Sequence, residues 1–424
     1  MKRTTHAARA AALAGAVALV LTACSGDADE SSDDDAAGGG ESDGSPLVIG
    51  SLLPVTGSLA FLGPPEIAGV DLAIEEINEA GGVNGGDIEV VHGDSGDAEN
   101  LAVAIQTVDD LLSQSVHVIV GAASSSVTYG VIDTVTEAEA VMFSPANTSP
   151  GLSGYSDFYF RTAPPDSVQG NALGNLVAGD GHEKVGILVF NDDYGTGLRN
   201  VVEETLVAEG VEVTYGGADA NEEFAPKQNN YEAEVQAVMA TDPDAIVLIA
   251  FEETAVIVPQ LFQAGYDTSN LYFTDGNTAN YPDLDAGVLE GAKGTIPGAF
   301  PSDEFQERLL GIDPDLTEYS YSAESYDAVI LSALAAQLGG TNDAATVQAN
   351  LPAASGAEGG TECATYAECV ELIDDGEDIM YVGQSGVGPF NEDNDPSSAF
   401  IGIYEYDAEN AITWTEAIFG EVAG

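Results

Sequence analysis

The stretches LVIGSLLPV (residues 47–55) and IAGVDLAIEEINEAGG (residues 67–82) together decide the fold. The first is a short, almost continuous apolar run, which predicts a buried strand. The second carries apolar residues at helical spacing and ends in a glycine pair, which predicts an amphipathic helix that stops there. Those apolar positions are Ile67, Val70, Ile74 and Ile77. A buried strand followed by such a helix is the repeating unit of an α/β sheet.

The same unit recurs along the chain. Further strands are predicted in DIEVVHGD (87–94), VIV (118–120) and AVMFSP (140–145), with helices over 101–112 and 127–140. After RTAPP (161–165) the rhythm restarts with strands in EKVGILVF (183–190), VEVTYGG (211–217), PDAIVLIAF (243–251) and NLYFTDG (270–276), and helices over 198–209, 231–240 and 254–264. Residues 291–424 add a helix at 323–338 and a strand-rich tail. Two such runs predict two doubly wound parallel-sheet lobes.

The N-terminus predicts export and a lipid anchor. Residues 1–23 combine a basic start, MKRTTHAAR, with an apolar run over 10–21 that is too short to span a bilayer, as in a signal peptide. The run ends in Leu-Thr-Ala-Cys24, which resembles a bacterial lipobox, where cleavage precedes the cysteine and a diacylglycerol is attached to its thiol. The alternative is a buried or disulfide-bonded cysteine at a chance position. We expect a protein held on the outer face of the cell membrane through lipidated Cys24.

Residues 24–46 predict a disordered acidic linker. The segment after Cys24 carries eight acidic residues, no basic residue and few apolar ones. Such a composition cannot bury enough surface to fold. A flexible tether suits a shuttle or a sensor better than a free secreted enzyme.

The charge balance is extreme. The chain has 9 Lys and Arg residues against 72 Asp and Glu residues, a formal net charge of -63. Such a surface repels phosphate backbones and anionic lipid head groups, which disfavours nucleic-acid and polybasic membrane functions. The hypothesis is a protein adapted to strong brine, and the alternative is a merely acidic secreted protein.

The two remaining cysteines predict a local disulfide. Cys363 and Cys369 lie six residues apart in TECATYAEC, in a protein expected outside the cytosol. A metal site is not expected, because the histidines after the signal segment are scattered, at His92, His117 and His182. No cofactor is predicted.

Candidate ligand-binding residues follow from the rule that ligands of open parallel sheets bind beyond the carboxyl ends of the strands. In the first lobe, Ser125 and Ser126 precede a helix, where unpaired N–H groups and the helix dipole favour a carboxylate. Thr148 on the neighbouring turn adds a hydroxyl, and the carbonyl of Asn147 offers an acceptor for an ammonium group. The alternative for Ser125 is a plain N-cap.

The second lobe offers the complementary groups. Asp275 supplies a negative charge, and Tyr194 supplies a ring to cover an apolar side chain together with a hydroxyl. The alternatives are a turn residue at Asp275 and a packed surface aromatic at Tyr194. Together the two lobes predict a site for a zwitterion, with its anionic end in one lobe and its cationic end in the other.

Enzyme signatures are absent from the sequence. There is no GxSxG elbow, no GxGxxG after the first strand, no Walker loop and no HExxH. A surface hydrolase is the weakest rival, since none of the three histidines lies in a predicted ligand turn. The acidic loop at 391–395 lacks the glycine and the terminal Glu of a calcium loop, so we expect a solvated turn.

A series of motifs is similar to the Leu/Ile/Val-type periplasmic binding proteins of ABC importers. In order they are GSLLPVTGSLAFLGPPEIAGVDLAIEEINEAGGVNG (50–85), VIVGAASSS (118–126), FSPANTSPGL (143–152), FRTAPPDSVQG (160–170), VFNDDYGTGL (189–198) and VGQSGVGPFNEDND (382–395). The resemblance runs over most of residues 47–338 and implies the type I fold, with two lobes joined by three crossovers. It places the crossovers near 163–164, 295–297 and 383–385, which divides the chain into lobe 1 (47–163 plus 297–383) and lobe 2 (164–296 plus 384–424).

The resemblance also implies roles for single residues. Ser125 and Thr148 would hold a ligand carboxylate and the Asn147 carbonyl an ammonium group, while Tyr194, Phe251 and Asp275 would close from the second lobe. This chain departs from the family at three positions: Leu62 stands where relatives often carry an aromatic, Phe251 where a Tyr is usual, and Asp275 where a longer Glu is usual.

The function implied by the resemblance is solute capture. We expect a monomeric, non-enzymatic protein that closes on a branched-chain or other amino acid and presents it to the membrane permease of an ABC importer. The departures leave an amide, a urea-like solute or an aromatic acid as alternative ligands. A sensory receptor module on the same fold is a rival role.

The charge balance generates a prediction. The Debye length falls from ~8 Å at physiological salt to ~3 Å at 1 M, so salt should relieve much of the self-repulsion. We expect the melting temperature of the chain from Pro46 onward to rise as NaCl is raised from 0.15 M to 1 M and beyond. Greatest stability in dilute buffer would refute the brine hypothesis.

Overall fold

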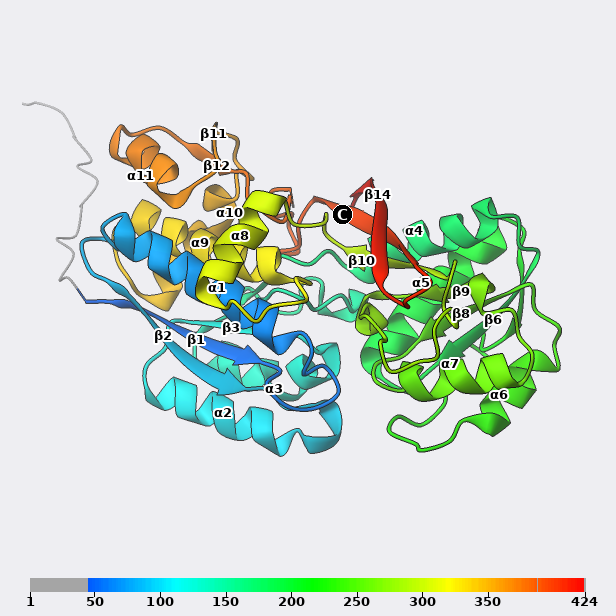
Figure 1. The fold of residues 1–424 in the computed structure, drawn as a ribbon. Helices are drawn as coiled ribbons and strands as arrows, with labels where there is room; N and C mark the ends of the chain where they lie inside the picture. Colours follow the sequence, from blue (N-terminus) through cyan, green and yellow to red (C-terminus); the bar gives the residue numbers. More distant parts are fainter. Residues whose placement is uncertain (1–44, 387, 423–424) are drawn as a thin grey trace, which may run out of the picture. The chain divides into compact units, whose positions relative to one another are not determined.

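Two large sheets, each covered by helices, and a small two-stranded sheet make up the part of the protein that the structure describes (Figure 1). The computed structural model describes residues 45–386 and 388–422, so the expected signal peptide, Cys24 and nearly all of the linker lie outside it. No helix within these residues is long and apolar enough to cross a membrane.

The strands and helices have the following bounds. The strands are β1 (Leu47–Leu53), β2 (Ile88–Asp94), β3 (Val118–Gly121), β4 (Val141–Ser144), β5 (Tyr159–Arg161), β6 (Lys184–Val189), β7 (Glu212–Tyr215), β8 (Ala245–Ile249), β9 (Leu271–Phe273), β10 (Lys293–Pro297), β11 (Thr361–Cys363), β12 (Ile379–Tyr381), β13 (Ser398–Tyr406) and β14 (Ile412–Glu421). The helices are α1 (Gly63–Glu79), α2 (Ala102–Ser113), α3 (Ser125–Glu137), α4 (Asp166–Gly179), α5 (Asp193–Ala208), α6 (Glu232–Met239), α7 (Thr254–Gln263), α8 (Asp303–Ile312), α9 (Ser322–Gly339), α10 (Ala344–Ala354) and α11 (Tyr366–Asp374).

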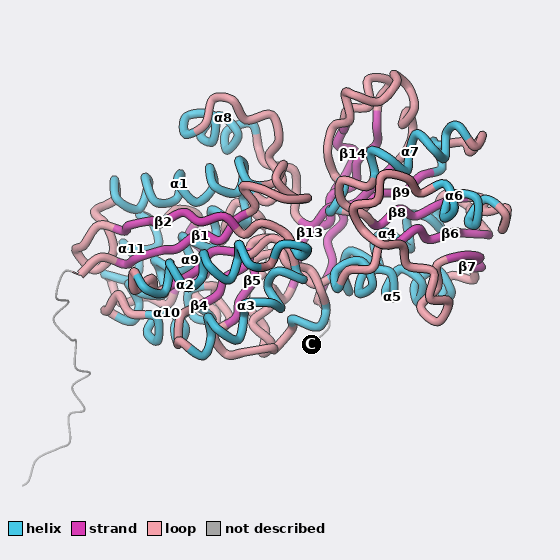
Figure 2. The backbone as a smooth tube through the Cα atoms, turned by 90° about the horizontal axis from the view of Figure 1, so that it is seen from below, coloured by secondary structure: helices cyan, strands magenta, loops and turns pink. Residues whose placement is uncertain are grey.

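The first sheet has the strand order β2-β1-β3-β4-β5, and all its pairs are parallel. Both faces are buried, so alternate residues of β3 enter different cores. Val118 and Val120 pack with residues of α1 and α9, whereas Ile119 packs with residues of α2 and α3. Accordingly α1 and α2 lie on opposite sides of this sheet (Figure 2). We call this sheet, with α1–α3 and α8–α11, the first lobe.

The second sheet has the order β14-β13-β10-β9-β8-β6-β7 and, with α4–α7, forms the second lobe. The strands from β7 to β10 pair in parallel, whereas β13 pairs antiparallel with β10 and with β14. The antiparallel edge arises because only a short turn joins β13 to β14 (Figure 1, red), and a turn of that length cannot join parallel strands. The predicted α/β fold with two doubly wound lobes is confirmed. The sequence predicted strands in the tail, but it did not predict that they pair antiparallel at the edge of the second sheet.

The chain crosses between the two sheets three times: between β5 and α4, between β10 and α8, and between β12 and β13. A buried ion pair ties the first crossing to the third. The Arg161 Nε atom lies 2.6 Å from Asp395 Oδ1, and the Arg161 side chain is fully buried. Arg161 Nη1 also donates to the carbonyls of Ser149 at 2.9 Å and Asn147 at 3.3 Å, so the same guanidinium fixes the loop after β4.

The far end of the first lobe carries a disulfide. Cys363 at the end of β11 is bonded to Cys369 in α11, with a Cα–Cα distance of 5.3 Å. Within the described residues, no group of three or more His, Cys, Asp or Glu side chains is arranged to hold a metal ion.

Replacement of Arg161 should destabilise the fold strongly. In Arg161→Met the Asp395 carboxylate would remain buried without its counter-charge, which costs about 3–5 kcal/mol of unfolding free energy. Urea denaturation in high salt measures the loss. The exposed Lys184, changed to Met, is the control and should alter stability by no more than about 0.5 kcal/mol. A loss below about 1 kcal/mol for Arg161→Met would contradict the role given to the pair.

Candidate functional site

A small cavity lies between the two lobes, at the carboxyl ends of their strands. Its wall is apolar except at a few positions, and it draws on both lobes. The lining residues are Leu59, Leu62, Ala123, Ser124, Ser125, Ala146, Tyr194, Phe251, Asp275, Gly276 and Tyr321. We call it the inner cavity. Of the residues predicted from the sequence, it brings together Leu62, Ser125, Tyr194, Phe251 and Asp275.

The first lobe contributes the N-terminus of α3. Ser124 is the N-cap residue, and its hydroxyl accepts from the N–H of Val127 at 3.4 Å. Ser125 begins the helix, is buried, and its hydroxyl accepts from the N–H of Ser149 at 3.3 Å. The N–H groups of the first helical turn have no partners within the helix, so they and Ser125 form a local site for an anion.

Asn147 and Thr148 lie beside this wall in the loop after β4. The Asn147 side chain holds the loop together, since its Oδ1 atom accepts from Thr128 at 2.7 Å and from Tyr159 at 3.0 Å. Its main-chain carbonyl, expected to meet an ammonium group, accepts from Arg161. The Thr148 hydroxyl is buried and makes no hydrogen bond with the described part of the chain.

Ser126 points to the other lobe instead of lining the inner cavity. Its hydroxyl donates to Asp192 at 2.8 Å and accepts from the N–H of Asp193 at 3.2 Å. Asp192 is the N-cap of α5, where it also accepts from the N–H of Tyr194 at 2.9 Å. Burial, partly offset by these hydrogen bonds, raises the pKa of Asp192 to about 6. Ser126 therefore joins the N-termini of α3 and α5 across the cleft.

The second lobe contributes an aromatic wall and a carboxylate. The rings of Tyr194 and Phe251 stack with centroids 5.5 Å apart and planes 15° from parallel. The Tyr194 hydroxyl donates to Asp275 Oδ1 at 2.6 Å. Asp275 begins the short helix η4 (Asp275–Asn277) directly after β9, so its side chain lies at the sheet edge. The hydrogen bond from Tyr194 thus holds the Asp275 carboxyl at the wall of the largely apolar inner cavity.

Tyr321 is a site residue that the sequence reasoning missed. It precedes α9 of the first lobe in the left-handed conformation, with φ 58°. Its hydroxyl donates to Asp275 Oδ2 at 2.7 Å, from the opposite lobe. Burial raises the pKa of Asp275 above its usual value despite the hydroxyl donors. No local pattern marks Tyr321, because its partner is 46 residues away along the chain.

Asp166 was also missed. It is the first residue of α4, within the FRTAPPDSVQG motif that was interpreted only as a crossover. The side chain is fully buried, and neither carboxylate oxygen makes a hydrogen bond among the described residues. Burial and the neighbouring charge of Asp275 raise the pKa of Asp166 well above its usual value.

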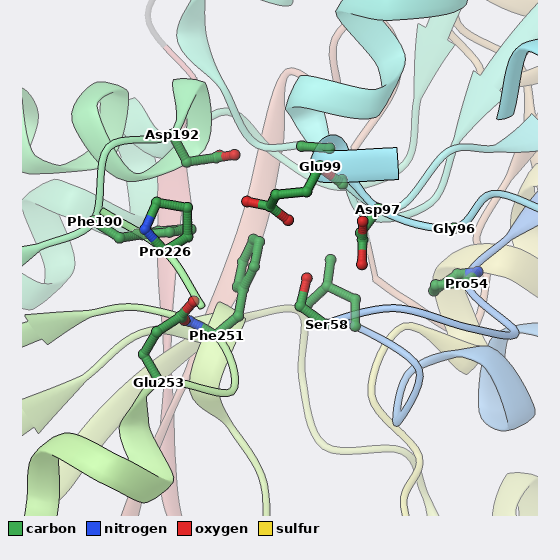
Figure 3. Close-up of a pocket in the computed structure, with 13 residues that line it drawn as sticks. Pro54, Ser58, Gly96, Asp97, Glu99, Phe190, Asp192, Pro226, Phe251 and Glu253 are labelled. Atoms are coloured by element: carbon green, nitrogen blue, oxygen red, sulfur yellow. The ribbon is translucent and has the colours of Figure 1, made fainter. Parts of the chain in front are cut away.

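A second cavity, the outer cavity, shares Leu59, Ser124 and Phe251 with the inner one. Figure 3 shows Asp192 and Phe251 from one lobe facing Glu99 and Ser58 from the other. An ion pair closes the lobes beside it, because Lys227 of the second lobe contacts Asp97 and lies 3.1 Å from Glu99 of the first.

Comparison with known proteins places this architecture. A family model described as periplasmic binding protein matches residues 46–365. The chain is 28% identical over 358 residues to the chemotactic signal transduction system substrate-binding protein BasB of Halobacterium salinarum, covering 81% of this chain and 83% of that protein. It is also 28% identical over 264 residues to a leucine-, isoleucine-, valine-, threonine- and alanine-binding protein of Pseudomonas aeruginosa, covering 61% and 68% of the two chains.

Solved structures share the fold. A leucine-binding protein LivK of Thermotoga maritima has a TM-score of 0.72 at 20% identity and covers 88% of this chain and 98% of its own. The LivJ protein of Streptococcus pneumoniae, in complex with isoleucine, has a TM-score of 0.70 at 24% identity, with coverages of 89% and 100%. A solute-binding protein of R. palustris in complex with 4-hydroxybenzoate has a TM-score of 0.70 at 16% identity, with coverages of 88% and 97%.

Three quarters of the chain fall within the family model, and the two-lobed sheet topology agrees with it. The chain therefore belongs to the periplasmic binding protein family, with the type I fold of its Leu/Ile/Val-type members.

Proposed function

We propose that this protein captures an aliphatic amino acid outside the cell and delivers it to an ABC importer. The observation that carries the proposal is the inner cavity, where Ser125 at the start of α3 and Asp275 of the other lobe stand on an otherwise largely apolar wall. The ligand carboxylate would lie at the α3 N-terminus, and its ammonium group would lie at Asp275. The side chain would pack on Leu62 and Phe251, and no catalytic step is involved.

Apolar contacts favour an aliphatic side chain. One part of the cavity wall consists of apolar side chains and offers the ligand no polar partner. It is formed by Leu59, Leu62, Ala123 and Ala146 from the first lobe and Phe251 from the second. Phe251 stands where a Tyr is usual in the family, so at this position the wall lacks a hydroxyl that relatives carry. The names of relatives that bind leucine, isoleucine and valine support the same ligand class.

Binding is proposed to proceed by hinge closure, with lobe 1 at 47–163 plus 297–383 and lobe 2 at 164–296 plus 384–424. The contacts from Ser126 to Asp192 and from Tyr321 to Asp275 support a closed form that both lobes stabilise. A shift from 1:99 to 99:1 in favour of that form needs about 5.5 kcal/mol of differential affinity, so the ligand must touch both lobes.

The proposed location is the outer face of the cell membrane, with Cys24 as the lipid anchor. The export signal and the acidic linker support it, and both lie outside the described residues. Partition into detergent of the wild-type protein, compared with Cys24→Ser, tests the anchor. Equal partition of the two would contradict it.

A second role needs a separate test because BasB, with similar length and sequence, is named as part of a chemotactic signalling system. In that role the closed protein would contact a membrane receptor instead of a permease. Deletion of the gene separates the two, since loss of labelled leucine uptake supports import, and loss of attraction to leucine with normal uptake supports sensing.

The ligand class is tested first by thermal shift in high salt, with the globular part from Pro46. We expect stabilisation by L-leucine, L-isoleucine or L-valine, since ligand at 100 times its Kd adds about 2.7 kcal/mol, typically a few degrees. Short amides, urea and 4-hydroxybenzoate are the comparison set. A response to that set with silence from the three amino acids would refute the proposed ligand class.

Ser125→Ala should weaken the binding of L-leucine. The ligand carboxylate would lose a buried hydroxyl partner, so Kd should rise roughly 5- to 150-fold, equivalent to about 1–3 kcal/mol. Ser113→Ala, at the exposed end of α2, is the matched control and should leave Kd unchanged. Titration calorimetry measures both, and an unchanged Kd in Ser125→Ala would remove this residue from the site.

A further inference from the structure

Three buried polar side chains near the inner cavity lack partners within the described chain. They are Asp166, through both carboxylate oxygens, Thr148, through its hydroxyl, and Gln169, through its amide oxygen. They lie in one place, because Asp166 and Gln169 are three residues apart on α4, and the N–H of Asp166 donates to the carbonyl of Thr148 at 2.7 Å. Nearly all buried polar groups in proteins are hydrogen-bonded, so such a cluster indicates that a hydrogen-bonding partner from outside the chain completes it.

The missing group must be a donor. Carboxylate and amide oxygens accept hydrogen bonds, and the Thr148 hydroxyl can both accept and donate. Asp275, which interacts with Asp166 through charge, has both oxygens occupied by tyrosine hydroxyls. The open acceptor positions therefore belong mainly to Asp166, because the neighbouring Thr148 hydroxyl lowers the pKa of this carboxyl without satisfying its two buried oxygens.

The charges around the pair leave it without a counter-ion. Arg161 on β5 faces Asp166, but its guanidinium is bound to Asp395 and to loop carbonyls. The groups that face Asp275 are the hydroxyls of Tyr194 on α5 and of Tyr321 before α9, the side chain of Gln169 on α4 and, through charge, Tyr404 on β13. Glu324 on α9 adds another carboxyl near Tyr321. Two carboxyls thus share a dry region, which strongly disfavours having both ionised.

We propose that Asp166 and Asp275 together bind the ammonium group of the ligand, and that this group replaces a proton held by the pair. The proposal rests on the proposed function and narrows its ligand class to molecules with a protonated amine. In the free protein the pair carries one proton and a net charge of minus one. When the zwitterion enters, the N–H groups donate to both carboxylates, the proton leaves to solvent, and the charge of the site stays the same.

The behaviour of the two acids supports this exchange. Burial raises the pKa of both acids, and for Asp166 the charge of Asp275 adds to the effect, so of the two acids Asp166 is the one that more readily keeps a proton. An incoming ammonium group supplies the positive charge that ionised Asp166 lacks, which lowers its pKa and releases the proton. A carboxylic acid without an amine brings no positive charge, so it does not release the proton from Asp166 and donates no hydrogen bond to the oxygens of that carboxyl.

The exchange makes binding depend on pH. Because a proton is released, the affinity for leucine should rise about tenfold per pH unit while the free pair is protonated, and should level off above its pKa. Calorimetric titration of L-leucine, L-isoleucine and L-valine in phosphate and in imidazole buffer at pH 7 and high salt counts the protons. We expect release of about one proton for each ligand bound.

Two probes and two variants separate the outcomes. The compound 4-methylpentanoate, which is leucine without its ammonium group, should bind roughly 10- to 100-fold more weakly and release no proton. Asp166→Asn should bind leucine without proton release and with a flat pH profile. Glu66→Gln is the matched control, since Glu66 is equally buried with a raised pKa, but the carboxyl that interacts with it is Glu324 and not Asp275. Its proton release should equal that of the wild type.

The failures of the two proposals are distinguishable. Leucine binding with no proton release, or with release retained in Asp166→Asn, would overturn the exchange and leave the capture of amino acids standing. Binding of 4-methylpentanoate as tightly as leucine would also overturn it. If none of the three amino acids binds, the proposed function fails and the exchange fails with it.

Discussion

The buried pair of Arg161 and Asp395 is the interaction on which the rest of the structure depends. It joins two of the three crossings between the lobes, and the same guanidinium holds the carbonyls of Asn147 and Ser149. Those carbonyls set the position of Thr148 and, through the N–H of Ser149, the hydroxyl of Ser125. A single cation thus fixes both the crossings between the lobes and the loop beside the inner cavity, because an unpaired charge at that depth would be very costly.

Much of the fold was predictable because the strands and helices differ in period. Buried strands such as β3 and β8 are short apolar runs between turns, and α1 carries its apolar residues at helical spacing. The positions of Ser125, Tyr194 and Asp275 followed from the rule on strand ends. Ser126 and Asn147 lie in the turns that the sequence predicted. Ser126 nevertheless joins the two lobes, and the Asn147 side chain orders its own loop.

Asp166 and Tyr321 could not be found in the same way. Their importance comes from the approach of segments far apart in the chain, which no window of sequence contains. Asp166 sits in a stretch where the family resemblance implies a crossover, and Tyr321 follows no strand of the predicted sheets. Burial without a partner is a property of the folded chain alone, and among the acidic residues that the structure describes it distinguishes Asp166 and Glu66.

Basic residues are few in this protein, and most of those that the structure describes form ion pairs. Of the six Lys and Arg residues that the structure describes, Arg161, Arg199, Lys227, Lys293 and Arg308 form ion pairs. They differ in their exposure to salt: Arg161 is fully buried, whereas the side chain of Lys227 is 33% exposed at the mouth of the cleft. In brine of about 1 M the screening length of ~3 Å is no longer than that contact. Raising the salt concentration therefore weakens the partly exposed contact at the mouth of the cleft more than the buried pair between the crossings, so two contacts that join the same lobes respond differently to the same ions.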